Sequence, residues 1–137
     1  DEVEGKSCRY KMKVIMKFFL LFAAVGAALA ANDDYYITAD DNLDMKAVVS
    51  SPMRMIAMTG CFLDKEPCDN VAQSYKDILP DAIMKGCQRC NNAQKRIFNT
   101  YIRGLRFNLP EEYNDFLNKY DPQKIFLDNF MEAVVYY

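Results

Sequence analysis

The sequence contains no histidine and no tryptophan, and only five of its 137 residues are glycine. Without histidine, the chain cannot form a Ser-His-Asp triad, a Cys-His dyad, a His-Glu-x-x-His zinc site or a haem site with a histidine ligand. Its 17 Lys+Arg and 19 Asp+Glu residues leave a net charge of −2, so we expect no nucleic-acid partner. The few glycines and prolines and the 51% of hydrophobic residues disfavour a disordered chain and a turn-rich β-sandwich.

A hydrophobic run near the N-terminus is typical of a secretory signal peptide. Lys13 and Lys17 precede an uncharged stretch over residues 18–29, and Ala28 and Ala30 supply the small-x-small pattern of a cleavage site. We predict a signal peptide over residues 12–30, with cleavage after Ala30. We expect residues 1–11, which precede the first methionine, to be an upstream leader outside the native product. A membrane anchor is the alternative, but the run is shorter than the roughly 20 residues that span a bilayer.

The predicted product is residues 31–137, one secreted and mildly acidic domain. Its length suits a single small domain, and it keeps four of the five cysteines because Cys8 lies in the leader. We expect it to be extracellular, in lymph or another extracellular fluid. We also expect it to be monomeric and not to remain inserted in a membrane once the signal peptide has been removed.

The remaining cysteines, Cys61, Cys68, Cys87 and Cys90, follow the spacing C-x6-C-x18-C-x2-C. An even number of cysteines in a small secreted chain predicts disulfides, and four cysteines allow three pairings. We favour the local pairing, Cys61–Cys68 and Cys87–Cys90, in which each short loop contributes about 2 kcal/mol. These local links would fasten helix ends without joining distant parts of the fold.

Two other uses of these thiols remain open at this point. A zinc site could take all four thiolates, but an oxidising secretory route disfavours it, as does the lack of a second C-x2-C pair. A thioredoxin-type redox site requires C-x-x-C at a helix start within a βαβ pattern. Here Cys87 follows Gly86 at the expected end of a helix, and no β-rich run precedes it.

Apolar residues of the product recur at helical spacings of three and four, and no run alternates convincingly as a strand would. We therefore expect an all-α fold of about six helices after an extended lead-in over residues 31–42. Pro80 lies within the third helix, where it predicts a kink or a break near Leu79. N-cap and first-turn residue types mark the helix starts. The expected starts are Asp41 or Asn42, Ser51-Pro52, Asp69, Asn91 or Asn92, Pro110, and Asp121-Pro122.

The cysteine spacing resembles that of the insect chemosensory proteins, the OS-D-like family. The segments that flank the cysteines are similar as well, and the resemblance covers about residues 33–126. The matching segments are Leu63-Asp64-Lys65, Leu79-Pro80-Asp81-Ala82, Gln94-Lys95, Pro110-Glu111-Glu112-Tyr113 and Lys119-Tyr120-Asp121-Pro122.

The resemblance implies a small secreted protein of six helices around an apolar channel, with the two local disulfides. Family members bind long-chain alcohols, acids, esters and similar semiochemicals, so the implied function is that of a soluble lipid carrier or pheromone-binding protein. Some members act instead in development, and none is an established enzyme. The resemblance is interrupted at Met58, where an aromatic residue commonly lies near the channel mouth, at Asp40 and at Tyr113. These differences concern ligand preference and the channel opening.

The apolar stripes of the expected helices supply the predicted lining of the channel. A long apolar small molecule is the expected partner, and we expect no cofactor and no metal. The predicted ligand-binding residues are Leu43, Val48, Met55, Met58, Phe62, Val71, Tyr75, Ile78, Ile83, Ile97, Tyr101, Leu105, Tyr113 and Phe116.

Two other functions are compatible with the same sequence. The same stripes could form a closed core in a secreted developmental or interaction protein with no transport role. An enzyme would have to use the acidic cluster of Glu111, Glu112 and Asp115, but negative charge is favourable in the first turn of a helix and explains this cluster without catalysis. We therefore expect no enzyme. Since there is no histidine, we also expect no ligand release on acidification to about pH 6.

Overall fold

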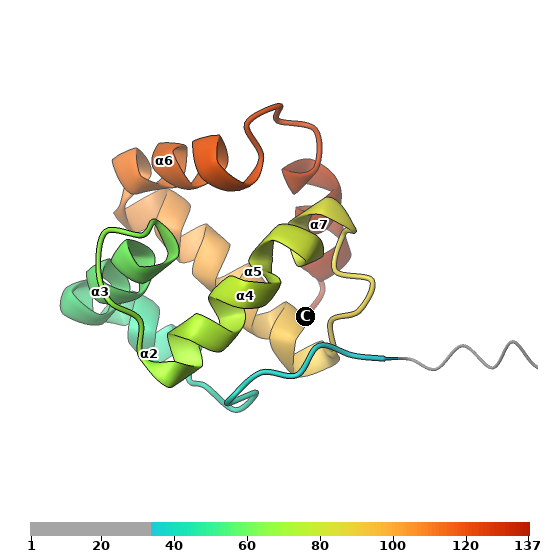
Figure 1. Cartoon of the computed structure of the whole chain (residues 1–137), viewed down its shortest axis with the longest axis horizontal. Helices are drawn as coiled ribbons and strands as arrows, with labels where there is room; N and C mark the ends of the chain where they lie inside the picture. The colour runs from blue at the N-terminus through green and yellow to red at the C-terminus, as the bar shows by residue number, and fades with distance from the viewer. Residues whose placement is uncertain (1–33) are drawn as a thin grey trace, which may run out of the picture. The chain divides into compact units, whose positions relative to one another are not determined.

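The computed structural model describes residues 34–137, so the predicted leader, signal peptide and cleavage site lie outside the described residues. Within this range the chain forms six α-helices and no β-strand (Figure 1), which confirms the expected all-α fold. Over the same range, no helix combines the length and apolar character that a membrane crossing requires. The helices, labelled as in Figure 1, are α2 (Met45–Ser50), α3 (Pro52–Phe62), α4 (Asn70–Met84), α5 (Asn92–Asn108), α6 (Pro110–Tyr120) and α7 (Leu127–Val134).

The two longest helices, α4 and α5, organise the bundle. α5 packs against α2, α6 and α7, while α4 packs against α3, α6 and α7. In Figure 1, α4 crosses in front of α5, α6 runs along the top, and α2 and α3 lie together at the left. The two central helices meet through the rings of Tyr75 and Phe98, whose centroids lie 5.7 Å apart.

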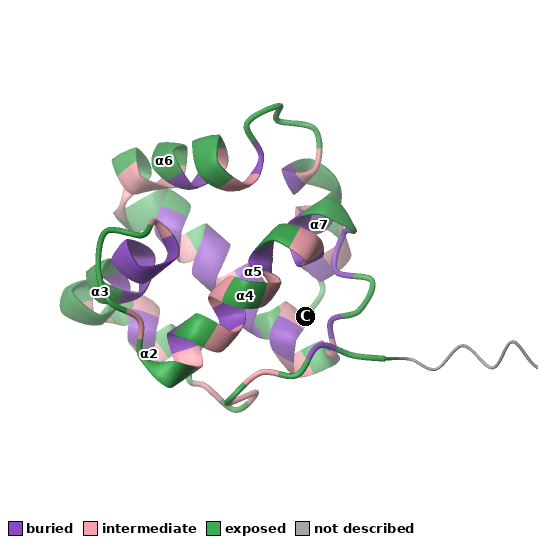
Figure 2. Ribbon diagram, in the orientation of Figure 1, coloured by how far each residue is buried: buried purple, intermediate pink, exposed green. Residues whose placement is uncertain are grey.

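The hydrophobic core collects the buried stripe of every helix (Figure 2). The stripe of α5 is the longest and follows the predicted spacing of three and four residues. Its members Ile97, Phe98, Tyr101, Ile102 and Leu105 are all at most 5% exposed. Burial of such a stripe stabilises a helix more than its intrinsic propensity does.

Three of the six described helices, α2, α4 and α5, begin at a residue whose side-chain oxygen accepts a hydrogen bond from the first turn. Asp69 accepts from the N–H of Ala72 at 2.7 Å, and Asn91 forms a capping box with Gln94. The prediction of Asp41 or Asn42 as the cap of the first helix was wrong. α2 is capped by Asp44, whose carboxylate lies 3.0 Å from the N–H of Ala47.

The third predicted helix is not broken at its proline. α4 runs without interruption from Asn70 to Met84, with Pro80 inside it. Proline removes one backbone donor and crowds the carbonyl of the residue four positions earlier. Core packing of Tyr75 and Leu79 before the proline and of Ala82 and Ile83 after it holds both halves in one helix.

The last helix starts later than predicted. Asp121-Pro122 has the residue types of a cap and a first turn, but α7 begins at Leu127. The Asp121 carboxylate instead accepts hydrogen bonds from the backbone N–H groups of Ile125, Phe126 and Leu127, at 2.9 to 3.1 Å. It therefore acts as a remote cap, which spans a turn before the helix begins.

The lead-in segment, residues 34–42, has no regular secondary structure but is firmly attached. The hydroxyl of Tyr36 donates to Asp81 of α4 at 2.6 Å, and its backbone N–H donates to the carbonyl of Arg89 at 2.9 Å. The buried amide of Gln94 in α5 donates to the carbonyl of Tyr36 at 2.8 Å. The hydroxyl of Tyr75 donates to the carbonyl of Asp40 at 3.0 Å. The segment thus binds α4 and α5 together at one end of the bundle.

Candidate functional site

An apolar pocket of about 300 Å³ lies between α2, α3 and α4, and we call it the α3 pocket. Four of the predicted ligand-binding residues meet in its wall: Leu43, Val48, Met58 and Val71. Val48 and Met58 are buried, whereas Leu43 and Val71 are half-buried. The other lining residues are Arg54, Ala57, Cys61, Pro67, Asp69 and Ala72. The volume is at the lower end of the range for small-molecule sites.

The helical repeat of α3 explains why Met58 reaches this pocket. Met55, Met58, Thr59 and Phe62 recur at spacings of three and four, and all four are buried. Met58 is 9% exposed, whereas the other three are at most 2% exposed. It therefore lies at the boundary between the α3 pocket and the core. A methionine at this position can change rotamer with little cost because its side chain is unbranched and flexible.

The structure separates the remaining predicted ligand-binding residues from this pocket. Ile78 and Tyr113 are half-buried against the core. Met55 also lines a pocket of about 520 Å³ beside α2, and Ile97 lines one of about 290 Å³ next to the lead-in segment. The eight core members are Met55, Phe62, Tyr75, Ile83, Ile97, Tyr101, Leu105 and Phe116, each at most 5% exposed.

Several lining residues of the α3 pocket were missed by the sequence analysis. Ala57 and Cys61 are one turn apart on α3, and Ala72 follows Val71 at the start of α4. A search for small residues one turn apart beside a predicted apolar stripe could have found Ala57. Arg54 and Asp69 add the charged groups of the pocket. No pattern in the sequence indicated that these two residues would come together.

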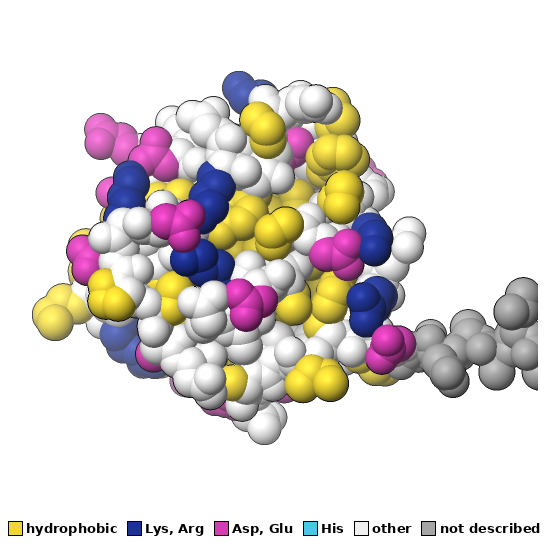
Figure 3. Space-filling model, in the orientation of Figure 1, with side chains coloured by type: hydrophobic (Ala, Val, Ile, Leu, Met, Phe, Trp, Pro, Cys, Tyr) yellow, Lys and Arg dark blue, Asp and Glu magenta, His cyan; other side chains and the backbone are white. Residues whose placement is uncertain are grey.

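A chain of aromatic rings runs through the core from α3 to α6. The ring of Tyr101 lies edge-on to Phe62, with centroids 5.1 Å apart, and to Phe116, with centroids 6.2 Å apart. The ring of Phe116 also contacts that of the half-buried Tyr120, with centroids 4.7 Å apart. Such edge-on contacts stabilise beyond the area that they bury. On the face shown in Figure 3, hydrophobic side chains are visible between α4 and α6, with charged side chains along the left border.

One polar contact lies inside this apolar region. The hydroxyl oxygens of Thr59 and Tyr101 are 3.0 Å apart, and both residues are 1% exposed. Burial raises the pKa of the Tyr101 hydroxyl above its ordinary value, so this group stays protonated at physiological pH. The pair is therefore neutral and can offer hydrogen bonds but no charge.

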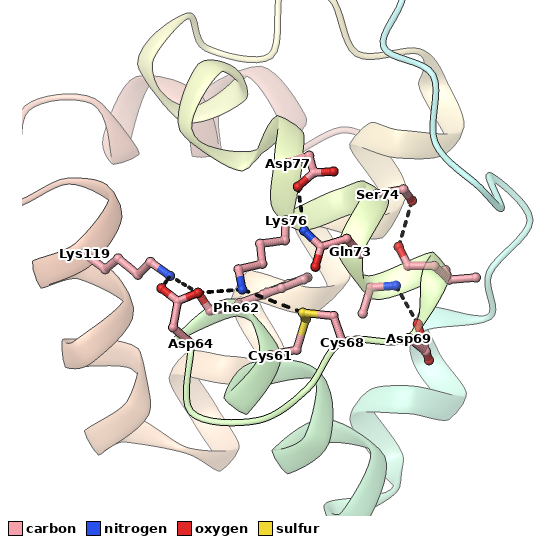
Figure 4. Close-up of a disulfide and its surroundings, with 12 residues drawn as sticks. Cys61, Phe62, Asp64, Cys68, Asp69, Gln73, Ser74, Lys76, Asp77 and Lys119 are labelled. Carbon is pink, nitrogen blue, oxygen red and sulfur yellow. Dashed lines mark hydrogen bonds and ion pairs between the residues drawn. A yellow bond between two sulfur atoms is a disulfide. The ribbon is translucent and has the colours of Figure 1, made fainter.

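Charged groups meet at the C-terminal end of α3 (Figure 4). Asp64 forms ion pairs with Lys76 of α4, at 2.6 Å, and with Lys119 of α6. The hydrogen bonds from Lys119 and Lys76 lower the pKa of Asp64 to about 2. The carbonyl of Phe62 accepts hydrogen bonds from Lys119 at 2.5 Å and from the Tyr120 hydroxyl at 2.7 Å. These contacts tie α6 to the ends of α3 and α4 beside the aromatic chain.

The predicted disulfide pairing is confirmed. Cys61–Cys68 joins the end of α3 to the loop before α4, and Cys87–Cys90 lies in the turn between α4 and α5. The zinc alternative is therefore excluded for these four thiols. In the part of the chain that the structure describes, no group of three His, Cys, Asp or Glu side chains could hold a metal ion.

The acidic cluster lies where the sequence analysis expected it. Glu111 and Glu112 occupy the first turn of α6, where their negative charges interact favourably with the helix dipole. Asp115 forms an ion pair with Lys65 at 2.6 Å, and both side chains are at least half exposed. These positions suit a solvated helix end.

Comparisons with known proteins agree with this architecture. The chain is 30% identical to ejaculatory bulb-specific protein 3 of Drosophila melanogaster over 115 residues, which cover 84% of this chain and 91% of that protein. It is 31% identical to the allergen Tha p 1 of Thaumetopoea pityocampa over 120 residues, 87% of this chain and 95% of that protein.

Solved structures show the same fold. A chemosensory protein in complex with bromo-dodecanol aligns with a TM-score of 0.64 and 24% identity, covering 71% of this chain and 97% of that one. The antennal chemosensory protein A6 from the moth Mamestra brassicae aligns with a TM-score of 0.58 and 23% identity, covering 70% of this chain and 89% of that one. The model of the insect pheromone-binding family A10/OS-D matches residues 36–128. The chain therefore belongs to the insect pheromone-binding family A10/OS-D.

Proposed function

We propose that this protein is a secreted, soluble and non-enzymatic carrier that binds one long-chain apolar molecule at the α3 pocket. The observation that supports the proposal most directly is the pocket wall, where Leu43, Val48, Met58 and Val71 present apolar side chains. A relative of the same fold is described in complex with bromo-dodecanol, which supports the same class of ligand here. Fatty alcohols, acids and esters, including semiochemicals, are the proposed cargo.

In this proposal, the ligand extends from the α3 pocket past Met58 into the core. We expect the buried rings of Phe62 and Tyr101, which contact each other, to line the next part of that route. The remaining predicted ligand-binding residues would surround the buried part of the ligand. A ligand with about 12 methylenes gains roughly 0.8 kcal/mol for each one that is buried, or about 10 kcal/mol in total. Association and ordering remove several kcal/mol. We therefore expect micromolar affinity and broad selectivity.

The test is displacement of a fluorescent apolar probe by alcohols of graded chain length. We expect uptake of the probe, a chain-length optimum and micromolar affinity. Val71→Trp would fill the wall of the α3 pocket and should weaken binding about tenfold or more. Gln73→Trp, at an exposed position two residues along the same helix, serves as the matched control and should leave the affinity within about twofold. Equal affinity for both variants would show that the ligand binds elsewhere.

A second function, that of a secreted interaction or developmental protein, is favoured by one observation. Met53 and Ile56 on α3 are 83% and 54% exposed, and together with Pro67 they line a shallow pocket of about 360 Å³. Neighbouring exposed apolar side chains are typical of contact surfaces. A folded, helical protein that takes up no probe would favour this second function over the carrier.

A further inference from the structure

Two hydroxyl groups are buried in the core, one of them on the residue that follows Met58. Thr59 and Tyr101 hydrogen-bond each other, and within residues 34–137 neither hydroxyl has another hydrogen-bond partner. The other well-buried polar side chains with a full set of contacts, Gln94 and Asp121, bond to backbone groups that need a partner. The Thr59–Tyr101 pair satisfies no such backbone group. Burial of two hydroxyls for a single mutual hydrogen bond contributes little to stability.

The pair keeps unused hydrogen-bonding capacity. Each hydroxyl has one donor and two acceptor lone pairs, and the mutual bond uses one donor and one lone pair. One O–H group and three lone pairs remain. A third hydroxyl group could therefore both accept a hydrogen bond from this pair and donate one to it.

The surroundings of the pair suit an uncharged group. The rings of Phe62 and Phe116 lie edge-on to Tyr101, and no charged side chain of residues 34–137 hydrogen-bonds either hydroxyl. Lys119 and Lys76, the cations that approach this end of α3, are both paired with Asp64, and Lys119 also donates to the carbonyl of Phe62. An ionised carboxylate at the pair would lose its hydration without gaining a counter-ion, which costs several kcal/mol.

The pair lies within reach of the α3 pocket. Met58 lines the pocket, and Thr59, the residue that follows it on α3, is buried in the core. A long ligand exceeds a pocket of about 300 Å³ and must displace a side chain to continue inward. Met58 is the flexible side chain at that boundary, and its displacement would open the pocket toward the core next to Thr59.

We propose that the Thr59–Tyr101 hydroxyl pair binds the head group of the cargo, so that the protein prefers long-chain neutral alcohols to the matching ethers and carboxylates. This inference rests on the proposed carrier function. It assigns head-group selectivity to one residue of α3 and one of α5.

The experiment compares dodecan-1-ol, its methyl ether and dodecanoate as competitors of N-phenyl-1-naphthylamine on the oxidised protein. Wild type should bind the alcohol about tenfold more tightly than either analogue. Tyr101→Phe and Thr59→Val each remove one hydroxyl at nearly constant volume. Both variants should lose that tenfold preference while their affinity for the ether changes less than about twofold. Thr100→Val removes the neighbouring half-buried hydroxyl of a different pocket and should keep the preference.

The possible failures can be told apart. If wild type binds the ether as tightly as the alcohol, or if Tyr101→Phe keeps the preference, the hydroxyl pair is not the head-group site and the carrier stands. If wild type takes up neither probe nor competitor, the carrier itself fails. Should both variants unfold, the ¹³C chemical shift of Tyr101 Cζ in wild type decides. It must move on addition of dodecan-1-ol and not of the ether, and an unchanged shift overturns the proposal.

Discussion

A single buried carboxylate organises the chain between α6 and α7. Asp121 is 1% exposed and accepts three backbone hydrogen bonds at the start of the last helix. Burial alone would raise its pKa, but the hydrogen bonds from the backbone outweigh burial and hold the pKa below its ordinary value. The carboxylate is therefore ionised at all physiological pH values and acts as a permanent acceptor.

We expect Asp121→Asn to lower the free energy of unfolding by about 2 kcal/mol at pH 7. An amide has one uncharged acceptor oxygen, so it cannot replace the three hydrogen bonds that the ionised carboxylate accepts. A group with a depressed pKa stabilises the fold above its unfolded pKa of about 4 and loses that effect as the pH falls through the folded pKa. The difference from wild type should therefore shrink below about pH 4. Urea unfolding at several pH values measures it.

Asp128→Asn is the matched control for this variant. Asp128 lies exposed in the first turn of the same helix, so the substitution changes the charge equally without removing the three hydrogen bonds. An equal loss of stability in both variants would mean that charge near α7, and not the remote cap, stabilises this region.

Some residue-level features could be predicted from the sequence and others could not. The four cysteines could be paired from their spacing, because a loop of a few residues can close within the local chain. Asp121 could be identified as a capping residue, but not its target, since a cap normally serves the residues two or three positions later. The hydroxyl pair of Thr59 and Tyr101 joins positions 42 residues apart, and no local pattern indicates such a contact.

At the scale of elements, α2 and α5 approach each other closely because Gly104 has no side chain. A Cβ atom at this position would lie 2.4 Å from Cγ1 and 2.7 Å from Cγ2 of Val49. Val49 is β-branched, so both methyl groups cannot rotate away at once. The contact between α2 and α5 therefore depends on this glycine.

We expect Gly104→Ala to lower the free energy of unfolding by about 1 kcal/mol. Overpacking costs about 1–3 kcal/mol, and the better helix propensity of alanine offsets up to about 1 kcal/mol of that loss. In a Val49→Ala background the contacts with the two methyl groups disappear and only the Cβ of residue 49 remains close, at 3.2 Å, so the same substitution should become about neutral. The double-mutant cycle is measured by urea unfolding. A substitution that is neutral or stabilising in wild type would show that α2 moves freely relative to α5.

The helix boundaries show which element-scale predictions depend on local chemistry. α6 begins at Pro110 as predicted, because proline with two following acids suits a first turn whatever the tertiary context. α4 continues through Pro80, because core contacts on both sides outweigh the local penalty. Local signals therefore predicted the starts of α3, α4, α5 and α6, whereas α2 and α7 begin later than predicted and the tertiary structure decided the continuity of α4.

At the scale of the whole molecule, the titratable groups with shifted pKa values keep the same charge over a wide pH range. The chain has no histidine. Asp41, Asp64, Asp81 and Asp121 have pKa values below the ordinary value, for which hydrogen bonds to the carboxylates are responsible, and that of Asp64 is about 2. Burial raises the pKa of Tyr75 and of Tyr120 to about 12. These groups keep one charge state between about pH 5 and pH 8.

We therefore expect ligand affinity and the free energy of unfolding to stay constant between about pH 5.5 and pH 7, and stability to fall below about pH 4 as the four aspartates gain protons. Probe binding and urea unfolding across this range measure both quantities. A loss of affinity between pH 7 and pH 5.5 would contradict the expectation and would point to a conformational step that involves other groups.

The attachment of the lead-in segment has a consequence for the order in which the molecule is assembled. Residues 34–42 leave the ribosome before every helix described here, yet their partners Asp81, Arg89 and Gln94 follow about 40 to 60 residues later. The segment must therefore wait, unpaired, until α4 and the start of α5 have been synthesised. The side chain of Gln94 accepts a hydrogen bond from the backbone N–H of Asn91, the N-cap of α5, and donates one to the carbonyl of Tyr36. The part of the domain that is made first is thus among the last to reach its final place.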